Sequence, residues 1–488
     1  EDENWTLYDL GSKGGTAVNG EKVASSVPVK LGDTITLGGV PLIFLPQTVA
    51  EREEQEAKRR AERPAAIWPS FLWLTVFQVL ACLQLLVAAG TEATIAIPLA
   101  FLGLTVLMWL YYAALRATRC VGFEMETIAF FLSTLSLSIT ASSAQSSLFK
   151  QFLAILLGLA LFLVLGLFLR DLSRVQKNRW LMAAAAIGLL GITLVIGNSK
   201  YGAVNWISIG GMSFQPSEIA KVAVIMYFSA RLSKRNTEKP RRLSPRSPLS
   251  GVVGFLDRIG FLELVPYGLI LLLIVGLMML EPHMSGTILI LAGAAAVLFA
   301  AGIKLYWFAG GGAALMGLVV LMMSGYQSTR ILVWQDPWAY PRDGGYQIIQ
   351  SLYAIGSGGL LGLGLGKSRQ KFLYLPEPEN DFIFAIVCEE LGLIGAGIVL
   401  ILFALLVMRG YWIAIHARDR FGALLVVGIT TLTAVQVFLN ISVVTNLIPT
   451  TGISLPFFSY GGTALMIQLA EMGIILSVSR QIPAPRQE

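Results

Sequence analysis

Long apolar runs alternate with short polar segments from Trp68 to the end of the chain. About twelve runs approach the roughly 20 residues that a helix needs to cross a bilayer. Because backbone polar groups in lipid must be satisfied within the segment, the pattern predicts an all-α polytopic membrane protein. The predicted spans are residues 68–90, 93–115, 126–143, 149–170, 180–198, 215–231, 265–282, 285–302, 305–325, 381–408, 420–445 and 452–478.

Residues 1–48 have a different pattern, in which short alternating apolar stretches are separated by Gly-Gly, Asn-Gly and Gly-Asp pairs. Such pairs are typical of β-hairpins, so this part is predicted to be a small soluble β element. Residues 49–67 contain a mixed-charge run and are predicted to be a solvated linker. Because the chain starts at Glu1 rather than Met, we expect it to be part of a longer protein.

The apolar pattern stops for about fifty residues, at 326–380, and this loop is rich in Gly, Pro, acids, bases and aromatics. Loops longer than about 15 residues are uncommon in compact proteins unless they bind or catalyse. We therefore expect the chemistry here, with a plain connector as the alternative.

Composition agrees with a membrane protein, because 55% of the 488 residues are hydrophobic and only 14% are charged. The net charge of +6 comes mostly from basic clusters between apolar runs, which argues against nucleic-acid binding. The three cysteines and two histidines are too scattered to predict a disulfide framework or a zinc site. No cofactor is assigned, and a divalent cation is left open.

The basic clusters follow the even-numbered apolar runs, so the positive-inside rule places these loops and both termini in the cytoplasm. Loop 326–380 then faces outward, although it contains five cations, Arg330, Arg342, Lys367, Arg369 and Lys371. Cations on the outer side predict an anionic partner.

The stretch Trp206–Lys221 is predicted to contain a helix that opens at Gln215 and Pro216. Glu218 and Lys221 are three residues apart, so they can pair on one face of that helix. The pair either fixes helix packing or forms, with Gln215, a polar wall of a cavity for a lipid headgroup.

Glu281 and His283 follow another apolar run. They are either a proton-handling pair or simply solvated.

Loop 326–380 contains two kinds of candidate residue. Asp336 and Asp343 lie in a Pro- and Gly-rich segment that can hold a carboxylate away from regular structure. The glycine run 356–366 precedes the basic segment 367–371, which suits a pyrophosphate or, alternatively, close helix packing. Further candidates for substrate binding in and after the loop are Gln347, Glu377 and Asp381. Acids at the start of the next helix, Glu389 and Glu390 included, also suit capping.

The stretch 446–462 is broken by Pro and Gly at the beginning of the last apolar run. Irregular backbone at membrane depth is tolerated where it lines a cavity. Ser459 and Tyr460 are therefore candidates for a second wall of the site.

Residues of about 126–480 resemble the SEDS family of cell-wall polymerases and morphogenesis proteins, the FtsW, RodA and SpoVE group. The resemblance rests on the motifs NWISIGGMSFQPSEIAK, EPHMSGT, GYQIIQSLYAIGSGGLLGLGLGKSRQKFLYLPEPENDFIFAIVCEELGLIG and IPTTGISLPFFSYGG. It implies a ten-helix core within 116–488, preceded by two extra transmembrane helices at 68–115. The first 48 residues resemble the second half of a forkhead-associated (FHA) domain, through the segments Asp9 to Ser12, Gly15-Thr16, Val18 to Gly20 and Leu31 to Asp33. Phosphothreonine binding is not assigned, since the family's phosphate-binding residues belong to the first half.

The resemblance implies a peptidoglycan glycosyltransferase that polymerises lipid II on the outer face of a bacterial cytoplasmic membrane, for division, cell shape or sporulation. It implies as partners a class B penicillin-binding transpeptidase and other divisome or elongasome proteins. The family's essential Asp aligns with Tyr340 here. Asp343 is then the favoured catalytic base and Asp336 the second candidate. Because of this departure, a lipid II flippase or other transporter and a catalytically weak divisome scaffold remain alternatives.

Overall fold

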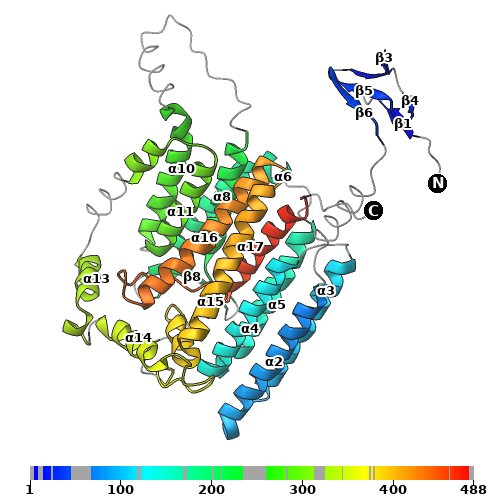
Figure 1. Ribbon diagram of the computed structural model, residues 1–488. Helices are drawn as coiled ribbons and strands as arrows, with labels where there is room; N and C mark the ends of the chain where they lie inside the picture. The colour runs from blue at the N-terminus through cyan, green and yellow to red at the C-terminus, as the bar shows by residue number, and fades with distance from the viewer. Residues whose placement is uncertain are drawn as a thin grey trace, which may run out of the picture. The chain divides into compact units, whose positions relative to one another are not determined.

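The computed structural model describes most of the chain as two compact units, residues 1–65 with 485–488 and residues 66–484. The described residues are 5–8, 15–23, 26–45, 67–117, 123–168, 173–200, 203–209, 212–234, 260–281, 284–312, 325–342, 344–372, 375–376, 380–460 and 462–482. Figure 1 shows the small β unit and the large helical unit.

The β unit consists of short antiparallel strands, as the alternating pattern predicts. The strands are β1 (Trp5–Tyr8), β2 (Thr16–Val18), β3 (Glu21–Lys22), β4 (Ser26–Val29), β5 (Thr34–Leu37) and β6 (Val40–Ile43), paired in the orders β1-β4 and β3-β2-β5-β6. Val18, Val23 and Val29 form its core. Asn19 adopts a φ of 53° in the turn between β2 and β3, and its side chain bonds Asp33 and the amide of Thr34. The Asn-Gly turn therefore also fixes the start of β5, the strand that pairs with β2.

The helical unit contains the predicted apolar runs as helices. Their bounds are α2 (Trp68–Ala89), α3 (Ala96–Ala117), α4 (Glu124–Ser143), α5 (Leu148–Phe168), α6 (Ser173–Lys177), α7 (Arg179–Ile196), α8 (Pro216–Leu232), α10 (Phe261–Leu280), α11 (Met284–Ala300), α13 (Gly325–Gln335), α14 (Gly345–Gly358), α15 (Ile383–His416), α16 (Arg420–Val444) and α17 (Thr463–Ser479), with the 3-10 turns η1 (Gly90–Glu92), η2 (Gln145–Ser147) and η4 (Pro337–Ala339). Eleven of the predicted runs coincide with one of these helices. Of the remaining run, residues 305–312 are helical and 313–324 lie outside the described residues.

Within the described residues, seven helices are long and apolar enough to cross a membrane by length and composition. They are α2, α3, α4, α5, α7, α15 and α16, and three shorter apolar helices lie in α10, α11 and α17. The prediction of an all-α polytopic membrane protein with a small β element is therefore confirmed.

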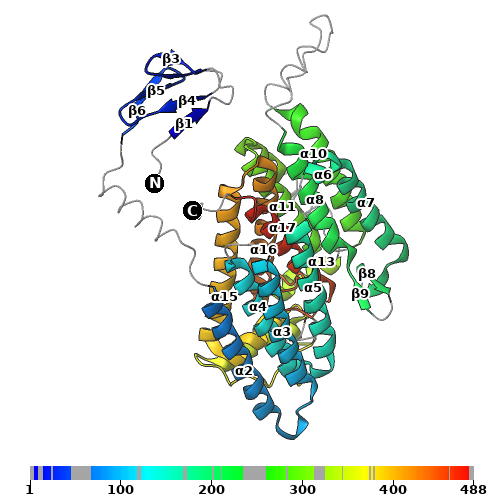
Figure 2. The same cartoon turned by 90° about the vertical axis from the view of Figure 1, so that its right-hand side faces the viewer.

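Close helix packing holds the unit together. On α5 and α17, a β-carbon added at Gly158 would lie 2.6 Å from Leu469, and one added at Gly473 would lie 2.7 Å from the carbonyl oxygen of Phe162. Glycine at these positions lets the two backbones approach, which is the usual way in which helices associate in lipid. Figures 1 and 2 both show α5 beside α17, and α2 with α3 next to α4 and α5.

Two features of the fold differ from the sequence prediction. Loop 326–380 is not structureless, because α13, η4 and α14 occupy most of its first part. Residues 198–214, which the pattern left as a connection into α8, contain the strands β7 (Asn198–Lys200), β8 (Ala203–Ile209) and β9 (Met212–Phe214) in one antiparallel sheet. The sequence pattern reveals apolar runs long enough to cross a membrane, and the short helices and strands in these two regions are too short to produce such a run.

Three arginines lie at or within two turns of the helix ends that are farther from loop 326–380 (Figure 1). Arg409 of α15 bonds Glu124 at the start of α4, with 3.2 Å between nitrogen and oxygen. The guanidinium of Arg420 donates to the carbonyl of Ala301 just after α11, and that of Arg480 donates to Gly166 near the end of α5. We call this side the arginine end of the helical unit and the side of loop 326–380 the loop end.

Candidate functional site

The loop end is built around two adjacent buried acids in the second turn of α15. Glu389 and Glu390 are 1% and 0% exposed. The carboxylate of Glu389 accepts hydrogen bonds from the hydroxyl of Ser368 and from the backbone amides of Arg369, at 3.0 Å, and Gln370, at 3.4 Å. This acid therefore holds the basic segment 367–371 in a tight turn, a structural task different from the capping that its sequence position suggested.

Glu390 joins the same segment to the end of α4. Its carboxylate accepts a hydrogen bond from the hydroxyl of Ser142 and one of 3.2 Å from the amide of Ser368. The ammonium of Lys371 lies 3.9 Å from Glu390 and donates to the carbonyls of Ser142, at 3.0 Å, and Gly366, at 2.7 Å. Burial lowers the pKa of Lys371, while the two glutamates counteract this by favouring its charged form.

The glycine run packs directly on the start of α15. The amides of Leu363 and Gly364 donate to the carbonyls of Glu389, at 2.9 Å, and Glu390, at 3.0 Å. These carbonyls are available because the helix is interrupted at Gly392, where φ is 67°. A β-carbon at Gly362 would lie 2.1 Å from the carbonyl oxygen of Glu390, so only glycine fits. This geometry is that of close packing, and both amides are already bonded within the chain.

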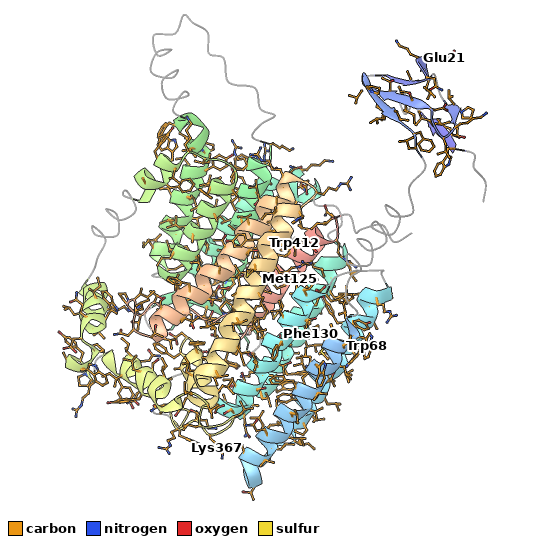
Figure 3. All side chains as sticks on the ribbon, in the orientation of Figure 1. Glu21, Trp68, Met125, Phe130, Lys367 and Trp412 are labelled. Carbon is orange, nitrogen blue, oxygen red and sulfur yellow. The ribbon has the colours of Figure 1, made fainter. Side chains whose placement is uncertain are left out.

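Two cations of the basic segment point outward. Lys367 and Arg369 are exposed, whereas Lys371 is partly buried in the contacts described above. Figure 3 labels Lys367 at the loop end of the unit. The exposed pair therefore forms a small cationic surface whose backbone is held by Glu389.

Another cation and an amide side chain of the loop bind backbone carbonyls. The guanidinium of Arg330 on α13 donates to the carbonyl of Thr450 at 3.0 Å, and the amide of Gln347 on α14 donates to Pro376 at 3.3 Å. Arg330 thus connects the loop with the irregular stretch 446–462.

The structure describes only one of the two acids that are candidates for the catalytic base. Asp336 is exposed and caps η4, where its carboxylate accepts from the amides of Trp338, at 3.1 Å, and Ala339, at 3.3 Å. Asp343 lies outside the described residues, as does Glu377. The intervening Tyr340 is 37% exposed at the surface of the loop.

Polar side chains of α16 fix the stretch 446–462, which is non-helical from 446 to 460 as the sequence predicts. The amide of Asn440 donates at 2.7 Å to the carbonyls of both Asp381 and Ile453, so it joins the end of the loop to this stretch. Ser459 is buried and its hydroxyl accepts from the amide of Leu455, at 2.7 Å, and Tyr460 is half-buried beside it.

The other predicted wall is at the start of α8. Gln215 is buried in extended backbone immediately before the helix, and its backbone N–H donates to the hydroxyl of Thr463 at 3.3 Å. Glu218 and Lys221 pair at 2.8 Å and are almost completely buried. Glu471 of α17 is close enough to interact electrostatically with both of them. Since the amide of Phe457 bonds Gln468 of α17, at 2.7 Å, this helix links the two predicted walls.

Glu281 is 0% exposed, so the interpretation that it is simply solvated is wrong. Within the described part of the chain, neither of its carboxyl oxygens has a hydrogen-bond partner. Burial raises the pKa of Glu281 to about 7. His283 lies outside the described residues, so its relation to Glu281 is not tested.

Sequence reasoning missed several residues that organise the site. Ser142, Ser368 and Asn440 were not singled out, and Glu389 and Glu390 were interpreted as helix-start acids. Two adjacent acids inside an apolar run, and a polar Gln436 four residues before Asn440 in another run, are detectable signals, because such groups in lipid are costly unless they are paired. Ser142 carries no such signal, since its partner Lys371 is 229 residues away.

Comparisons with known proteins agree with this architecture. The family profile described as "Cell cycle protein", which covers FtsW, RodA and SpoVE, matches residues 124–483. An FHA domain profile matches residues 1–38. The two extra helices α2 and α3 lie between these two matched regions.

Relatives of known name are similar over most of their length. A probable peptidoglycan glycosyltransferase FtsW of Geobacter sp. (strain M18) is 42% identical over 289 residues, which cover 59% of this chain and 74% of that protein. Stage V sporulation protein E of Bacillus subtilis (strain 168) is 42% identical over 298 residues, covering 60% of this chain and 76% of that protein.

Two solved structures are similar over 74% of this chain and 97% of their own. A structure described as the coordination of polymerization and crosslinking by a peptidoglycan synthase complex matches with a TM-score of 0.61 and 28% identity. The rod shape determining protein RodA of Thermus thermophilus matches with a TM-score of 0.54 and 26% identity. The family profile covers well over half of the chain, and the chain therefore belongs to the FtsW/RodA/SpoVE family of cell cycle proteins.

Proposed function

We propose that this protein is a peptidoglycan glycosyltransferase that polymerises lipid II into glycan strands. The observation that carries the proposal is the family match over residues 124–483, with relatives named peptidoglycan glycosyltransferase FtsW at 42% identity. The similarity to a peptidoglycan synthase complex supports the same activity.

In this reaction the 4-hydroxyl of one lipid-linked disaccharide attacks the anomeric carbon of another. The bond from that carbon to the pyrophosphate oxygen breaks, the hydroxyl proton passes to a base, and undecaprenyl pyrophosphate leaves. A positioned base typically raises the reaction rate by about 10²- to 10⁴-fold, and cations stabilise the charge that develops on the leaving group.

We assign the base to Asp343, with Asp336 as the second candidate, because both acids lie in the segment where the family has its essential Asp. Asp336 caps η4, so one of its oxygens is already engaged, which favours Asp343. A shift of three residues from Tyr340 is within the reach of this Gly-rich loop.

The leaving pyrophosphate would meet the exposed cations Lys367 and Arg369, whose backbone Glu389 holds in place. Lys371 and Arg330 would support that surface from inside the chain, through their carbonyl contacts. The paired Glu218 and Lys221 would form the polar wall of a headgroup cavity on the side of α8.

The protein would lie in the cytoplasmic membrane with its loop end outward and its termini in the cytoplasm. The arginines at the opposite ends of α15, α16 and α17 support this orientation, because Lys and Arg accumulate on the cytoplasmic side. A class B penicillin-binding transpeptidase would crosslink the product, which is the kind of pairing that the matched synthase complex describes.

The test is polymerisation of labelled lipid II by the purified full chain together with its candidate transpeptidase. Asp343→Ala, Asp336→Ala and Tyr340→Asp are compared with the wild type. Loss of activity in Asp343→Ala is the expected result. An inactive wild type that gains activity in Tyr340→Asp would refute the proposal and favour a scaffold that has kept the fold without the chemistry.

A further inference from the structure

Gly366 is the point where the basic segment meets an extra N-terminal helix. Its carbonyl accepts the bond from Lys371, and its amide bonds the carboxylate of Glu390. On its other side, a β-carbon added to Gly366 would lie only 2.8 Å from the β-carbon of Ala88 and 4.0 Å from Leu85, both on α2. The helix therefore lies directly against the residue that precedes the exposed cations.

The contact is formed by the outer end of α2, the end that is closest to loop 326–380. Figures 1 and 2 both show this end of α2 beside the segment that follows α14. Figure 3 labels Trp68 at the start of the helix and Lys367 near its other end. A single helix thus runs from the arginine end of the unit to the basic segment.

A polar network fixes α2 within the membrane region. Gln78 is 0% exposed, and its side chain donates to the hydroxyl of Thr134 on α4, at 3.0 Å, and accepts from Thr105 on α3, at 2.7 Å. Hydrogen bonds between helices in lipid stabilise their association, because the polar groups would otherwise lie unpaired in hydrocarbon. The amide of Gln78 ties α2, α3 and α4 together at one depth.

An aromatic cluster fixes the same three helices nearer to the arginine end. The ring of Phe71 on α2 is buried and lies 6.1 Å from those of Trp109 on α3 and Phe130 on α4. The indole nitrogen of Trp109 also donates to the hydroxyl of Thr75 at 3.0 Å. With two attachment levels, α2 cannot tilt or slide without breaking one of them, so its outer end has a defined position.

The end of α4 holds the same segment through Ser142, as described above. The basic segment therefore contacts α4 on one side and α2 on the other. These two helices are joined to each other through Gln78 and Phe71. The family profile begins at residue 124, so α2 and α3 lie outside the part of the chain that the family accounts for.

We propose that the α2–α3 hairpin is a positioning element that sets the conformation of segment 366–371 and, through it, the placement of Lys367 and Arg369. This inference rests on the proposed polymerase function. A displacement of about 1 Å in a positioning contact can cost up to 10²-fold in rate, so a contact at Gly366 is close enough to the cations to matter.

The test enlarges the side chain at the contact and uses its neighbour as a matched control. Ala88→Leu would push α2 and Gly366 apart, whereas Val87→Leu changes a side chain that is 82% exposed on the same turn. Both variants are made in the full chain. Their thermal unfolding is measured first, so that a loss of folding is recognised.

The first readout is lipid II polymerisation, with kcat and KM determined separately. We expect Ala88→Leu to lower kcat by on the order of 10-fold, Val87→Leu to match the wild type, and Ala88→Ser to retain activity because it keeps the volume small.

The second readout reports on the residue that directly follows segment 366–371 and needs no activity. Phe372, which is 69% exposed, is replaced by Cys, and its labelling rate by a membrane-impermeant maleimide is measured. The background replaces the native cysteines with Ala at Cys82, Cys120 and Cys388. Ala88→Leu should change the labelling rate several-fold and Val87→Leu should not.

Equal labelling and equal kcat in Ala88→Leu and Val87→Leu would overturn the proposal. If the wild type does not polymerise lipid II, the proposed function fails by itself, while the labelling rates still decide whether α2 positions the segment.

Discussion

The ammonium of Lys371 donates a hydrogen bond to the carbonyl of Ser142 at 3.0 Å, across 229 residues of sequence. The hydroxyl of Ser142 in turn donates to the carboxylate of Glu390. Lys371, Ser142 and Glu390 thus form one continuous polar network between loop 326–380, α4 and α15. Because Glu390 is completely buried, its charge depends on these partners.

Replacing Lys371 should therefore destabilise the protein more than replacing an exposed lysine of the same segment. We expect Lys371→Met to lower the free energy of unfolding by about 1–3 kcal/mol, because it leaves a buried carboxylate without its cation. Lys367→Met, at an exposed position, is the control and should have little effect. Thermal unfolding in detergent measures both.

A second substitution checks the cause of that loss. Glu390→Gln removes the buried charge, so in the Lys371→Met background it should recover part of the lost stability. Strictly additive losses in the double variant would mean that the two side chains are not coupled.

Asp336 should contribute to stability as a cap. Asp336→Ala is expected to cost about 1 kcal/mol, since the amides of Trp338 and Ala339 lose their acceptor. Asp336→Asn should retain most of the stability that Asp336→Ala loses, because the oxygen of an amide side chain also accepts hydrogen bonds from the two backbone amides. Thermal unfolding tests the cap, and polymerisation by the Asn variant separates this role from that of a base, which Asn cannot fill.

Glu281 should make stability depend on pH. Its pKa rises from 4.5 to about 7 on folding because the carboxyl is buried. The folded state therefore binds this proton more tightly than the unfolded state does. The free energy of unfolding should fall as pH rises from about 4.5 to about 7, and stay level above that.

Glu281→Gln is neutral throughout and should lack this fall. Between pH of about 5 and about 8, the melting temperature of the wild type should decline by roughly 2–4 °C more than that of the variant. Glu124, whose side chain is 57% exposed, provides the control Glu124→Gln. A decline that is the same in Glu281→Gln as in the wild type would exclude Glu281 as its source.

Much of the helical framework could be predicted from the sequence, because crossing a bilayer imposes a length and an apolarity that are visible without a structure. The opening of α8 at Pro216 and the pairing of Glu218 with Lys221 could also be predicted, since both depend on neighbours within one helical turn. These are local consequences of spacing.

The organisation of the candidate site could be predicted only in part. The loop was located by composition, and its cations Lys367 and Arg369 are exposed as an anion-binding role requires. The partners of Lys371 and Gly366 could not be predicted, because Ser142 and Ala88 belong to helices far away in the chain. Such contacts depend on how the helices pack, and no periodic pattern in the sequence indicates them.

The glycine run provides the sharpest test of what this segment does. Gly362 has a φ of 79°, and a β-carbon there would lie 2.1 Å from the carbonyl oxygen of Glu390. Gly362→Ala should therefore cost about 3 kcal/mol or more, since both the backbone conformation and the packing resist it. Gly356, in the last turn of α14, has no atom within 4 Å of its added β-carbon.

Gly356→Ala is accordingly the matched control, and it should be neutral or stabilise α14 by up to about 1 kcal/mol. Thermal unfolding and the yield of folded protein measure both variants. If Gly362→Ala folded as well as Gly356→Ala but lost polymerisation, close packing on α15 would not explain the run. Its glycines would then have to approach the lipid-linked substrate instead.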